Sequence, residues 1–244
     1  MTAPMSRIID HHLINILEEH ATEPETLVIL DLDDTVFTAE PGHVGNAWCK
    51  YMLMYGQNLG LSYKEAADIV IPEFIKRQEL NRIRPVEATT VATIRQLQAR
   101  KIPVVGLTAR IITLKDYTIR DLASLGLDFS TSVPTPACLN LEVANFGAWH
   151  GGIGFCNDHY KDAILQHLLE TTGYRPAKIV FVDDIERYIV KVQSVAERYN
   201  IPYVGIRYGH LDAVTAAYVL DETSKLIFHA PSTPTPQTQA TTTI

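Results

Sequence analysis

Short runs of apolar residues that end in carboxylates mark two points along the chain. Residues 27–30 and 179–182 each consist of four consecutive apolar residues. Aspartates follow both runs, at Asp31, Asp33 and Asp34 after the first and at Asp183 and Asp184 after the second. A continuous apolar run of this length is typical of a strand that is buried on both faces. The pattern therefore predicts two buried strands whose carboxyl ends carry acids.

Between these runs the apolar residues recur at helical spacing. Two further strands are expected at residues 102–108 and 203–206. Helices are expected at residues 5–20, 86–100, 113–125, 163–172, 185–199 and 212–225. Regular alternation of helices and strands predicts an α/β fold, a Rossmann-like parallel sheet with helices on both faces. Ligands of such sheets bind at the carboxyl ends of the strands.

The pattern changes after the first acidic run. Residues 38–42 contain a turn that is expected to act as a hinge, and apolar residues then follow helical spacing from Val44 to Tyr55. Ser62 and Glu65 fit a capping box that opens a second helix, in which Pro72 marks a kink or a new start. This stretch predicts a small helical cap inserted after the first strand.

The expected division of the chain follows from these patterns. Residues 1–37 and 85–229 form the core, and residues 38–84 form the cap. Residues 230–244 are rich in Pro and Thr and are expected to be a disordered tail. Within the core, residues 127–157 are less helical, and a β-hairpin is expected to turn at Gly151-Gly152. His150, Cys156 and His159 lie near it but match no zinc spacing.

Composition limits the classes of function. The net charge is −7 with no long basic run, which argues against a nucleic-acid partner. Three widely spaced cysteines without a C-x-x-C pair argue against a disulfide scaffold or a structural zinc site. The chain shows neither a signal peptide pattern nor an apolar run of membrane-spanning length, so we expect a cytoplasmic protein without a membrane-spanning segment.

The acids at the strand ends need a counter-charge. Carboxylates that converge at one sheet edge repel each other, and a divalent cation with oxygen ligands is the simplest way to hold them together. Thr108 ends another strand, and Lys161 opens a helix, so a hydroxyl and a cation for phosphate oxygens are expected nearby. A carboxylate nucleophile, a cation and a metal site are the groups that phosphoryl transfer needs.

On these residues the sequence resembles the haloacid dehalogenase (HAD) superfamily. Asp31-Leu-Asp33-Asp34-Thr35, Leu107-Thr108-Ala109-Arg110, Lys161 and Phe181-Val182-Asp183-Asp184 are similar to its four motifs in order. The resemblance covers residues 25 to about 210, with the cap where that superfamily places its first cap type. More narrowly, residues 97–110, 152–155 and 205–208 are similar to a bacterial HAD-like group, DUF2608.

The resemblance implies a role for each motif residue. Asp31 is the nucleophile that forms an aspartyl-phosphate, and Asp33 is the general acid and base. Thr108, the Ala109 N–H and Lys161 hold the phosphate. Magnesium is bound by the Asp31 carboxylate, the Asp33 carbonyl and Asp184, with Asp183 acting through water.

An acid at Asp33 favours a phosphatase, because an alkoxide leaving group gains from a proton whereas a halide does not. The predicted function is a magnesium-dependent phosphomonoesterase. The alternatives are a phosphotransferase or mutase that uses the same intermediate, and a binding protein for phosphorylated ligands without catalysis.

The substrate stays open between a phosphorylated small molecule and a phosphoprotein, including phosphotyrosine. Aromatic cap residues are candidates to shape the pocket, namely Trp48, Tyr51 and Tyr55. Basic residues near the end of the cap are candidates to contact an anionic substrate, namely Lys76, Arg77, Arg82 and Arg84.

Overall fold

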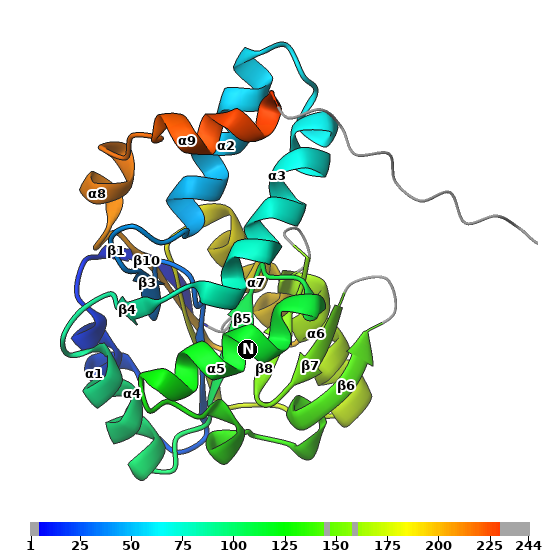
Figure 1. Ribbon diagram of the computed structural model, residues 1–244. Coiled ribbons are helices and arrows are strands. Elements are labelled where there is room, and N and C mark those ends of the chain that lie inside the picture. The colour runs from blue at the N-terminus through cyan, green and yellow to red at the C-terminus, as the bar shows by residue number, and fades with distance from the viewer. Residues whose placement is uncertain (1–4, 144–146, 158–160, 230–244) are drawn as a thin grey trace, which may run out of the picture.

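A mixed eight-stranded sheet forms the centre of the computed structural model, which describes residues 5–143, 147–157 and 161–229 (Figure 1). The strand order is β1-β10-β9-β2-β5-β8-β7-β6, and neighbours from β1 to β8 run parallel. The strands span Ser6–His11 (β1), Thr26–Leu30 (β2), Val104–Thr108 (β5), Asn140–Val143 (β6), Gly147–His150 (β7), Ile153–Phe155 (β8), Lys178–Asp183 (β9) and Tyr203–Tyr208 (β10). The expected parallel α/β sheet is confirmed.

Helices cover both faces of this sheet. Successive strand residues point to opposite faces, so Val28 and Leu30 pack with α1, α4 and α5, whereas Leu27 and Ile29 pack with α6 and α7. These helices span Leu17–His20 (α1), Thr90–Ala99 (α4), Lys115–Ser124 (α5), Lys161–Thr172 (α6) and Glu186–Arg198 (α7). Two apolar layers therefore hold β2 in the middle of the fold.

The N-terminal segment differs from its prediction as a helix over residues 5–20. Residues Ser6–His11 form β1, the edge strand that pairs in parallel with β10. Only the end of the segment is helical, as a 3₁₀ turn at Ile14–Ile16 followed by the short α1. The cap is consequently inserted after the second strand of the chain and not after the first.

A small two-stranded sheet, β3–β4, lies at the base of the inserted residues. β3 (Phe37–Ala39) pairs antiparallel with β4 (Ile83–Pro85), so the two connections to the cap lie side by side. The predicted 38–42 hinge thus begins inside a strand. Helices α2 (Asn46–Asn58) and α3 (Tyr63–Arg77) lie between β3 and β4 in the chain. The capping box is confirmed, because Ser62 Oγ accepts from Glu65 N and Glu65 Oε2 accepts from Ser62 N. α3 continues through Pro72.

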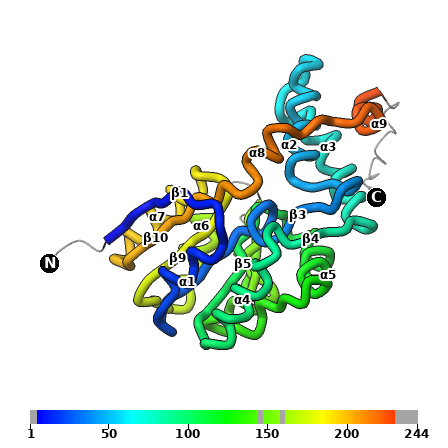
Figure 2. Tube along the Cα trace, turned by 90° about the vertical axis from the view of Figure 1, so that its left-hand side faces the viewer, coloured from blue at the N-terminus to red at the C-terminus, as the bar shows by residue number. Residues whose placement is uncertain are grey.

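The described C-terminal residues pack mainly against the cap helices, and Asp212 also pairs with Arg207 of β10. The expected helix 212–225 is broken into α8 (Asp212–Ala216) and α9 (Glu222–Lys225), with a 3₁₀ turn at Leu226–Phe228. Figure 2 shows this segment beside α2 and α3 at one end of the molecule. Trp48 Nε1 donates to Ser224 Oγ at 2.8 Å, and the Tyr51 hydroxyl donates to the Thr215 carbonyl at 3.0 Å.

The same apolar cluster joins α2, α3 and this segment. Buried Trp48, Met52 and Val70 pack against the partly buried Tyr218 and Phe228. Four apolar residues of this segment, which the sequence assigned to the core, therefore pack against the hydrophobic cluster of the cap, namely Tyr218, Leu220, Ile227 and Phe228.

The hairpin expected near Gly151-Gly152 is confirmed. β7 and β8 pair antiparallel across these two glycines, whose φ angles are +57° and +81°. At Gly152 a Cβ atom would lie 2.6 Å from the Phe129 backbone, so both the φ angle and the space require glycine. His159 and the tail at residues 230–244 lie outside the described residues.

Candidate active site

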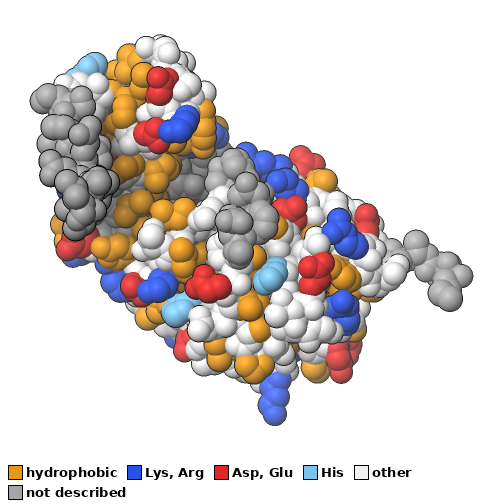
Figure 3. All heavy atoms as spheres, turned by 90° about the vertical axis from the view of Figure 1, so that its right-hand side faces the viewer, with side chains coloured by type: hydrophobic (Ala, Val, Ile, Leu, Met, Phe, Trp, Pro, Cys, Tyr) orange, Lys and Arg blue, Asp and Glu red, His pale blue; other side chains and the backbone are white. Residues whose placement is uncertain are grey.

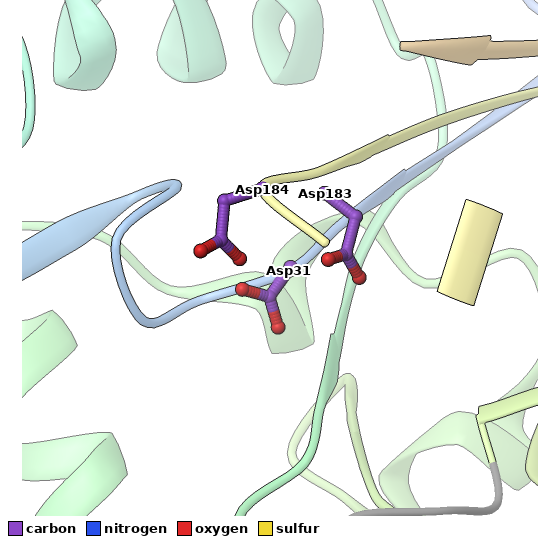
Figure 4. A group of neighbouring side chains, drawn as sticks. All are labelled: Asp31, Asp183 and Asp184. Atoms are coloured by element: carbon purple, nitrogen blue, oxygen red, sulfur yellow. The ribbon is translucent and has the colours of Figure 1, made fainter. Parts of the chain in front are cut away.

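Three aspartates meet at the carboxyl ends of β2 and β9, which are adjacent in the sheet. The Asp31 N–H donates to the Val182 carbonyl at 2.9 Å, which joins the two strand ends. One carboxylate oxygen each from Asp31, Asp183 and Asp184 lies within 4.8 Å of the others. In Figure 4 these side chains converge on one space. The described residues contain no other such group of His, Cys, Asp and Glu.

Lys161, the first residue of α6, contacts two of these three aspartates. Its Nζ donates to Asp31 Oδ1 at 2.5 Å and to Asp183 Oδ2 at 2.7 Å. The side chain is 1% exposed, and Nζ lies 4.5 Å from the centre of the Tyr188 ring. Burial alone would lower the pKa of Lys161, but the Asp183 and Asp31 carboxylates outweigh it and raise this pKa. Lys161 is therefore a permanently charged partner of two acids.

One lysine does not neutralise three carboxylates. Burial raises the pKa of Asp31 to about 7, against the opposing effect of Lys161. Burial, together with Asp183 and Asp31, also raises the pKa of Asp184 well above its usual value. Such a set of converging oxygen donors with excess negative charge suits a hard divalent cation. The residues present thus fit Mg²⁺, and Asp31, Asp183 and Asp184 are the side chains that would hold it.

Asp33 lies outside this group of side chains. Its carboxylate accepts two hydrogen bonds from Arg110, Nε to Oδ2 at 2.7 Å and Nη2 to Oδ1 at 2.9 Å. The Asp33 backbone forms an isolated β-bridge with Phe37, the first residue of β3. The predicted acid and base is thus held beside the hinge by an arginine to which the sequence analysis gave no role.

Thr108 and Ala109 lie next to Asp31, because β5 pairs with β2 in the sheet. Thr108 is buried, and its Oγ1 accepts from the Arg110 N–H at 3.1 Å. Its carbonyl accepts from Cys156 N at 3.1 Å and from Cys156 Sγ at 2.6 Å. Among the described residues no acceptor takes the hydroxyl hydrogen of Thr108, which leaves this hydrogen available for a phosphate oxygen.

Asp34 is a second functional candidate that the sequence analysis left without a role. It has a φ of 60°, a left-handed conformation that Asp adopts more readily than most residues. The carboxylate accepts from Thr38 Oγ1 at 2.8 Å, and burial raises its pKa to about 6. Asp34 lies where the acidic strand end turns toward the cap. The only hint of this role in the sequence is that Asp34 is the third acid of the first motif.

A cleft of about 380 Å³ lies at the junction of the cap, the β3–β4 sheet and the C-terminal segment. In Figure 3 the cap stands above the core, and hydrophobic side chains gather along their junction. Asp34 lines the cleft together with Trp48, Tyr218, Arg77 and Arg84.

The four basic residues proposed as substrate contacts separate in space. Arg77 and Arg84 line this cleft. Lys76 is 79% exposed and lies 3.9 Å from Glu73, and Arg82 lines a different hollow. Tyr51 and Tyr55 turn toward the C-terminal segment, where their rings pack against Tyr218 and Phe228.

We expect magnesium to stabilise the protein, and more so at alkaline than at acidic pH. Burial raises the pKa of Asp31 from 3.8, its value in an exposed side chain, to about 7 in the folded protein. The folded state therefore binds a proton that the unfolded state has lost, and the metal-free protein loses stability as the pH rises through about 7. Magnesium replaces the bound proton. At a concentration one hundred times its Kd it adds about 2.7 kcal/mol to the free energy of unfolding. Thermal melting with MgCl₂ or EDTA at about pH 5 and about pH 8 measures this. An equal Tm with and without magnesium at the higher pH would contradict it.

The fold and this site define the class: an α/β protein with a lysine-bound carboxylate group at the carboxyl edge of a parallel sheet. The chain belongs to the DUF2608 family, whose description is "Protein of unknown function (DUF2608)" and whose model matches residues 9–228. This match confirms the narrower of the two resemblances seen in the sequence.

Similar proteins are found in Chlamydia. A protein of Chlamydia pneumoniae named "Putative outer membrane protein" is 28% identical over 74% of this chain and 68% of its own length. A protein of Chlamydia trachomatis with the name "Putative outer membrane protein" is 24% identical over 85% of this chain and 81% of its own length. A structure titled "Crystal structure of putative beta-phosphoglucomutase from Thermotoga maritima" has 14% identity and a TM-score of 0.41, and covers 79% of this chain and 100% of that chain.

These names contradict the cytoplasmic location expected from the sequence. The relatives, including one from Chlamydia muridarum, are named as outer membrane proteins, which points to a location outside the cytoplasm. The expected location was wrong because the lack of a recognisable signal peptide or long apolar run does not determine where a protein resides. Within residues 5–143, 147–157 and 161–229, no helix has the length and apolar character needed to cross a bilayer.

Proposed function

We propose that this protein is a magnesium-dependent phosphomonoesterase that acts through an aspartyl-phosphate on Asp31. One observation carries the proposal: Lys161 Nζ lies 2.5 Å from Asp31 Oδ1, within the group of three aspartates. A buried cation that touches a buried carboxylate favours the ionised form of that carboxylate, and it is suited to receive a dianionic phosphate beside it. The four-motif resemblance to the HAD superfamily supports the same assignment.

In the first half of the reaction, an Asp31 carboxylate oxygen forms a bond to phosphorus. The bond from phosphorus to the leaving oxygen breaks, and Asp33 gives that oxygen a proton. Thr108 Oγ1, the Ala109 N–H and Lys161 bind the phosphate oxygens and keep the phosphorus in line with Asp31. Because phosphoryl transfer depends mainly on position and on charge stabilisation, these contacts account for most of the expected catalysis.

In the second half, Asp33 takes a proton from water as the water oxygen bonds to phosphorus. The bond between Asp31 and phosphorus breaks, and inorganic phosphate leaves. Asp33 is then protonated again for the next substrate. When bound by Asp31, Asp183 and Asp184, Mg²⁺ would supply positive charge next to the phosphate.

The cleft supports a small phosphorylated molecule as substrate. Its volume of about 380 Å³ lies in the range typical of small-molecule sites, and its wall includes Asp34, the neighbour of the predicted acid and base. The partly buried Tyr218 offers apolar surface to the part of the substrate that leaves, and the buried Trp48 lies in the same wall.

Arg84 is the cleft residue best placed to attract an anion. Its side chain is exposed, lines the cleft and makes no ion pair or side-chain hydrogen bond with a described residue. We expect Arg84→Ala to raise KM about fivefold, equivalent to about 1 kcal/mol, with kcat nearly unchanged. Steady-state kinetics on p-nitrophenyl phosphate measure both constants, and Arg82→Ala is the matched control. A fall in kcat with constant KM would contradict this prediction.

The test of the proposed function is hydrolysis of p-nitrophenyl phosphate by the full chain with magnesium and with EDTA. Magnesium-dependent release of p-nitrophenol and an alkali-labile mass increase of one phosphoryl group on Asp31 after rapid acid quench are expected. Addition of a simple alcohol measures transfer, and a product that is mainly the new phosphate ester would indicate a phosphotransferase. No hydrolysis by folded, magnesium-loaded protein of any aryl or alkyl phosphate tested would overturn the proposal.

A further inference from the structure

The side chain of Arg110 is almost fully buried, yet it bears a charge. It is 5% exposed, and its guanidinium has several polar and aromatic neighbours. Two of its nitrogens bind the Asp33 carboxylate, and Nη1 donates to Thr118 Oγ1 at 3.1 Å. Nη1 also lies 4.0 Å from Asp121 Oδ2, and the guanidinium carbon lies 5.0 Å from the centre of the Phe37 ring. The guanidinium is therefore fixed in position and orientation.

The Asp33 carboxylate is fixed by this guanidinium but stays open to the site. Its side chain is 17% exposed, more than three times the exposed fraction of Arg110. A fork of two parallel hydrogen bonds sets the plane of the carboxylate as well as its distance. Each carboxylate oxygen can accept two hydrogen bonds, so each keeps one lone pair for another partner. Asp33 thus presents a free lone pair from a defined position.

Stability alone is a weak reason for such a pair. Burial of an arginine and an aspartate removes water from both, and the attraction between them offsets this cost only in part. The pair instead joins two parts of the site. The Arg110 N–H binds Thr108 Oγ1, while the Arg110 side chain binds Asp33. One short turn after β5 therefore places both the predicted phosphate-binding hydroxyl and the predicted acid.

We propose that Arg110 is the positioning residue that holds the Asp33 carboxylate in line with the leaving oxygen of the substrate. This inference rests on the proposed phosphomonoesterase activity. Arg110 itself exchanges no proton, because a guanidinium stays protonated in proteins. Asp33 transfers its proton to the leaving oxygen as the bond from phosphorus breaks, and Arg110 keeps its carboxylate at the required distance and angle.

The test compares two substrates that differ in their need for that proton. p-Nitrophenolate is a stable anion and leaves with little help, whereas an alkoxide needs a proton as it leaves. General acid catalysis contributes roughly 10² to 10⁴-fold. We therefore expect Arg110→Lys, which keeps the charge but loses the fork, to lower kcat/KM for an alkyl phosphate about 100-fold, and for p-nitrophenyl phosphate less than about tenfold. The ratio kcat/KM includes only steps up to departure of the leaving group, so the later attack of water does not enter.

Four further variants make the test specific. Arg95→Lys is the matched control, because Arg95 donates to the Gly126 carbonyl through Nε at 3.1 Å and Nη2 at 2.7 Å, away from the described partners of Arg110. This control should lower kcat/KM only slightly, and by the same factor for both substrates. Thr118→Val removes the partner of Arg110 Nη1 and should repeat the bias against the alkyl phosphate at smaller size. This variant carries the test if Arg110→Lys does not fold. The double variant of Arg110→Lys and Asp33→Asn should be no worse on the alkyl phosphate than Asp33→Asn alone, since both act through one proton.

The outcomes separate this inference from the proposed function. If the wild type hydrolyses both substrates and Arg110→Lys or Thr118→Val lowers both equally, Arg110 is only structural and the inference is overturned, while the phosphatase proposal stands. Additive losses in the double variant overturn the inference in the same way. If the wild type hydrolyses neither substrate, both are overturned.

Discussion

Asp31→Asn is expected to abolish phosphatase activity while the protein stays folded. The substitution keeps the shape of the side chain but removes the oxygen anion that bonds to phosphorus, and loss of a nucleophile costs about 10⁴ to 10⁶-fold in kcat. Stability should change little or increase in the metal-free protein, because burial already raises the pKa of Asp31 to about 7 and Lys161 still binds Asp183 at 2.7 Å. Hydrolysis of p-nitrophenyl phosphate at saturating magnesium measures the loss.

The control for this variant is Asp116→Asn, which removes an exposed acid from a surface ion pair with Lys115. Full activity of the control together with loss in Asp31→Asn assigns the effect to the site. Retention of more than about a hundredth of the wild-type kcat by Asp31→Asn would rule out a covalent role for Asp31.

Lys161→Met is expected to destabilise the metal-free protein by about 3–5 kcal/mol, because removal of one partner leaves buried carboxylates without a counter-charge. Methionine fills a similar length, so cavity formation contributes little. The loss should be smaller in saturating magnesium, because the cation takes over part of the counter-charge. Urea unfolding at neutral pH, with magnesium and with EDTA, measures both quantities.

Lys115→Met provides the comparison, because the Lys115–Asp116 pair has the same type of contact at 2.8 Å on the surface. Surface pairs contribute about 0–1 kcal/mol, so this variant should unfold almost as the wild type does. A loss below about 1 kcal/mol in metal-free Lys161→Met would show that Lys161 does not balance the acids of the site. Absence of any magnesium rescue would separate the lysine from the cation site.

The strands in the middle of the sheet were predictable because each is coded by local sequence. Residues 27–30 and 179–182 are buried on both faces, and a run of apolar residues is the direct consequence. β1 was not predictable in this way. Its partner β10 lies almost 200 residues later in the chain, at Tyr203–Tyr208, and an edge strand with one paired side needs no continuous apolar run. The spacing of Ile8, Ile9 and Leu13 therefore fits a helix equally well.

The convergence of Asp31, Asp183 and Asp184 could be predicted from the sequence for a topological reason. Carboxyl ends of parallel strands meet at one edge, so acids placed there converge whatever the details of packing. The bond between Arg110 and Asp33 and the left-handed conformation of Asp34 depend on side-chain and backbone angles that no sequence spacing encodes. The same limit explains why residues 212–228 were assigned to the core. The apolar residues of this segment, such as Tyr218 and Phe228, pack against Trp48 and Met52, which are distant in sequence.

The association of residues 212–228 with α2 and α3 changes what counts as an exchangeable unit in this family. A chimaera that exchanges only residues 46–77 between two relatives would separate Trp48 from Ser224 and Tyr51 from Thr215. The new helices would then meet a C-terminal segment selected for other partners. Residues 46–77 and 212–228 would therefore have to be exchanged together to keep these two hydrogen bonds.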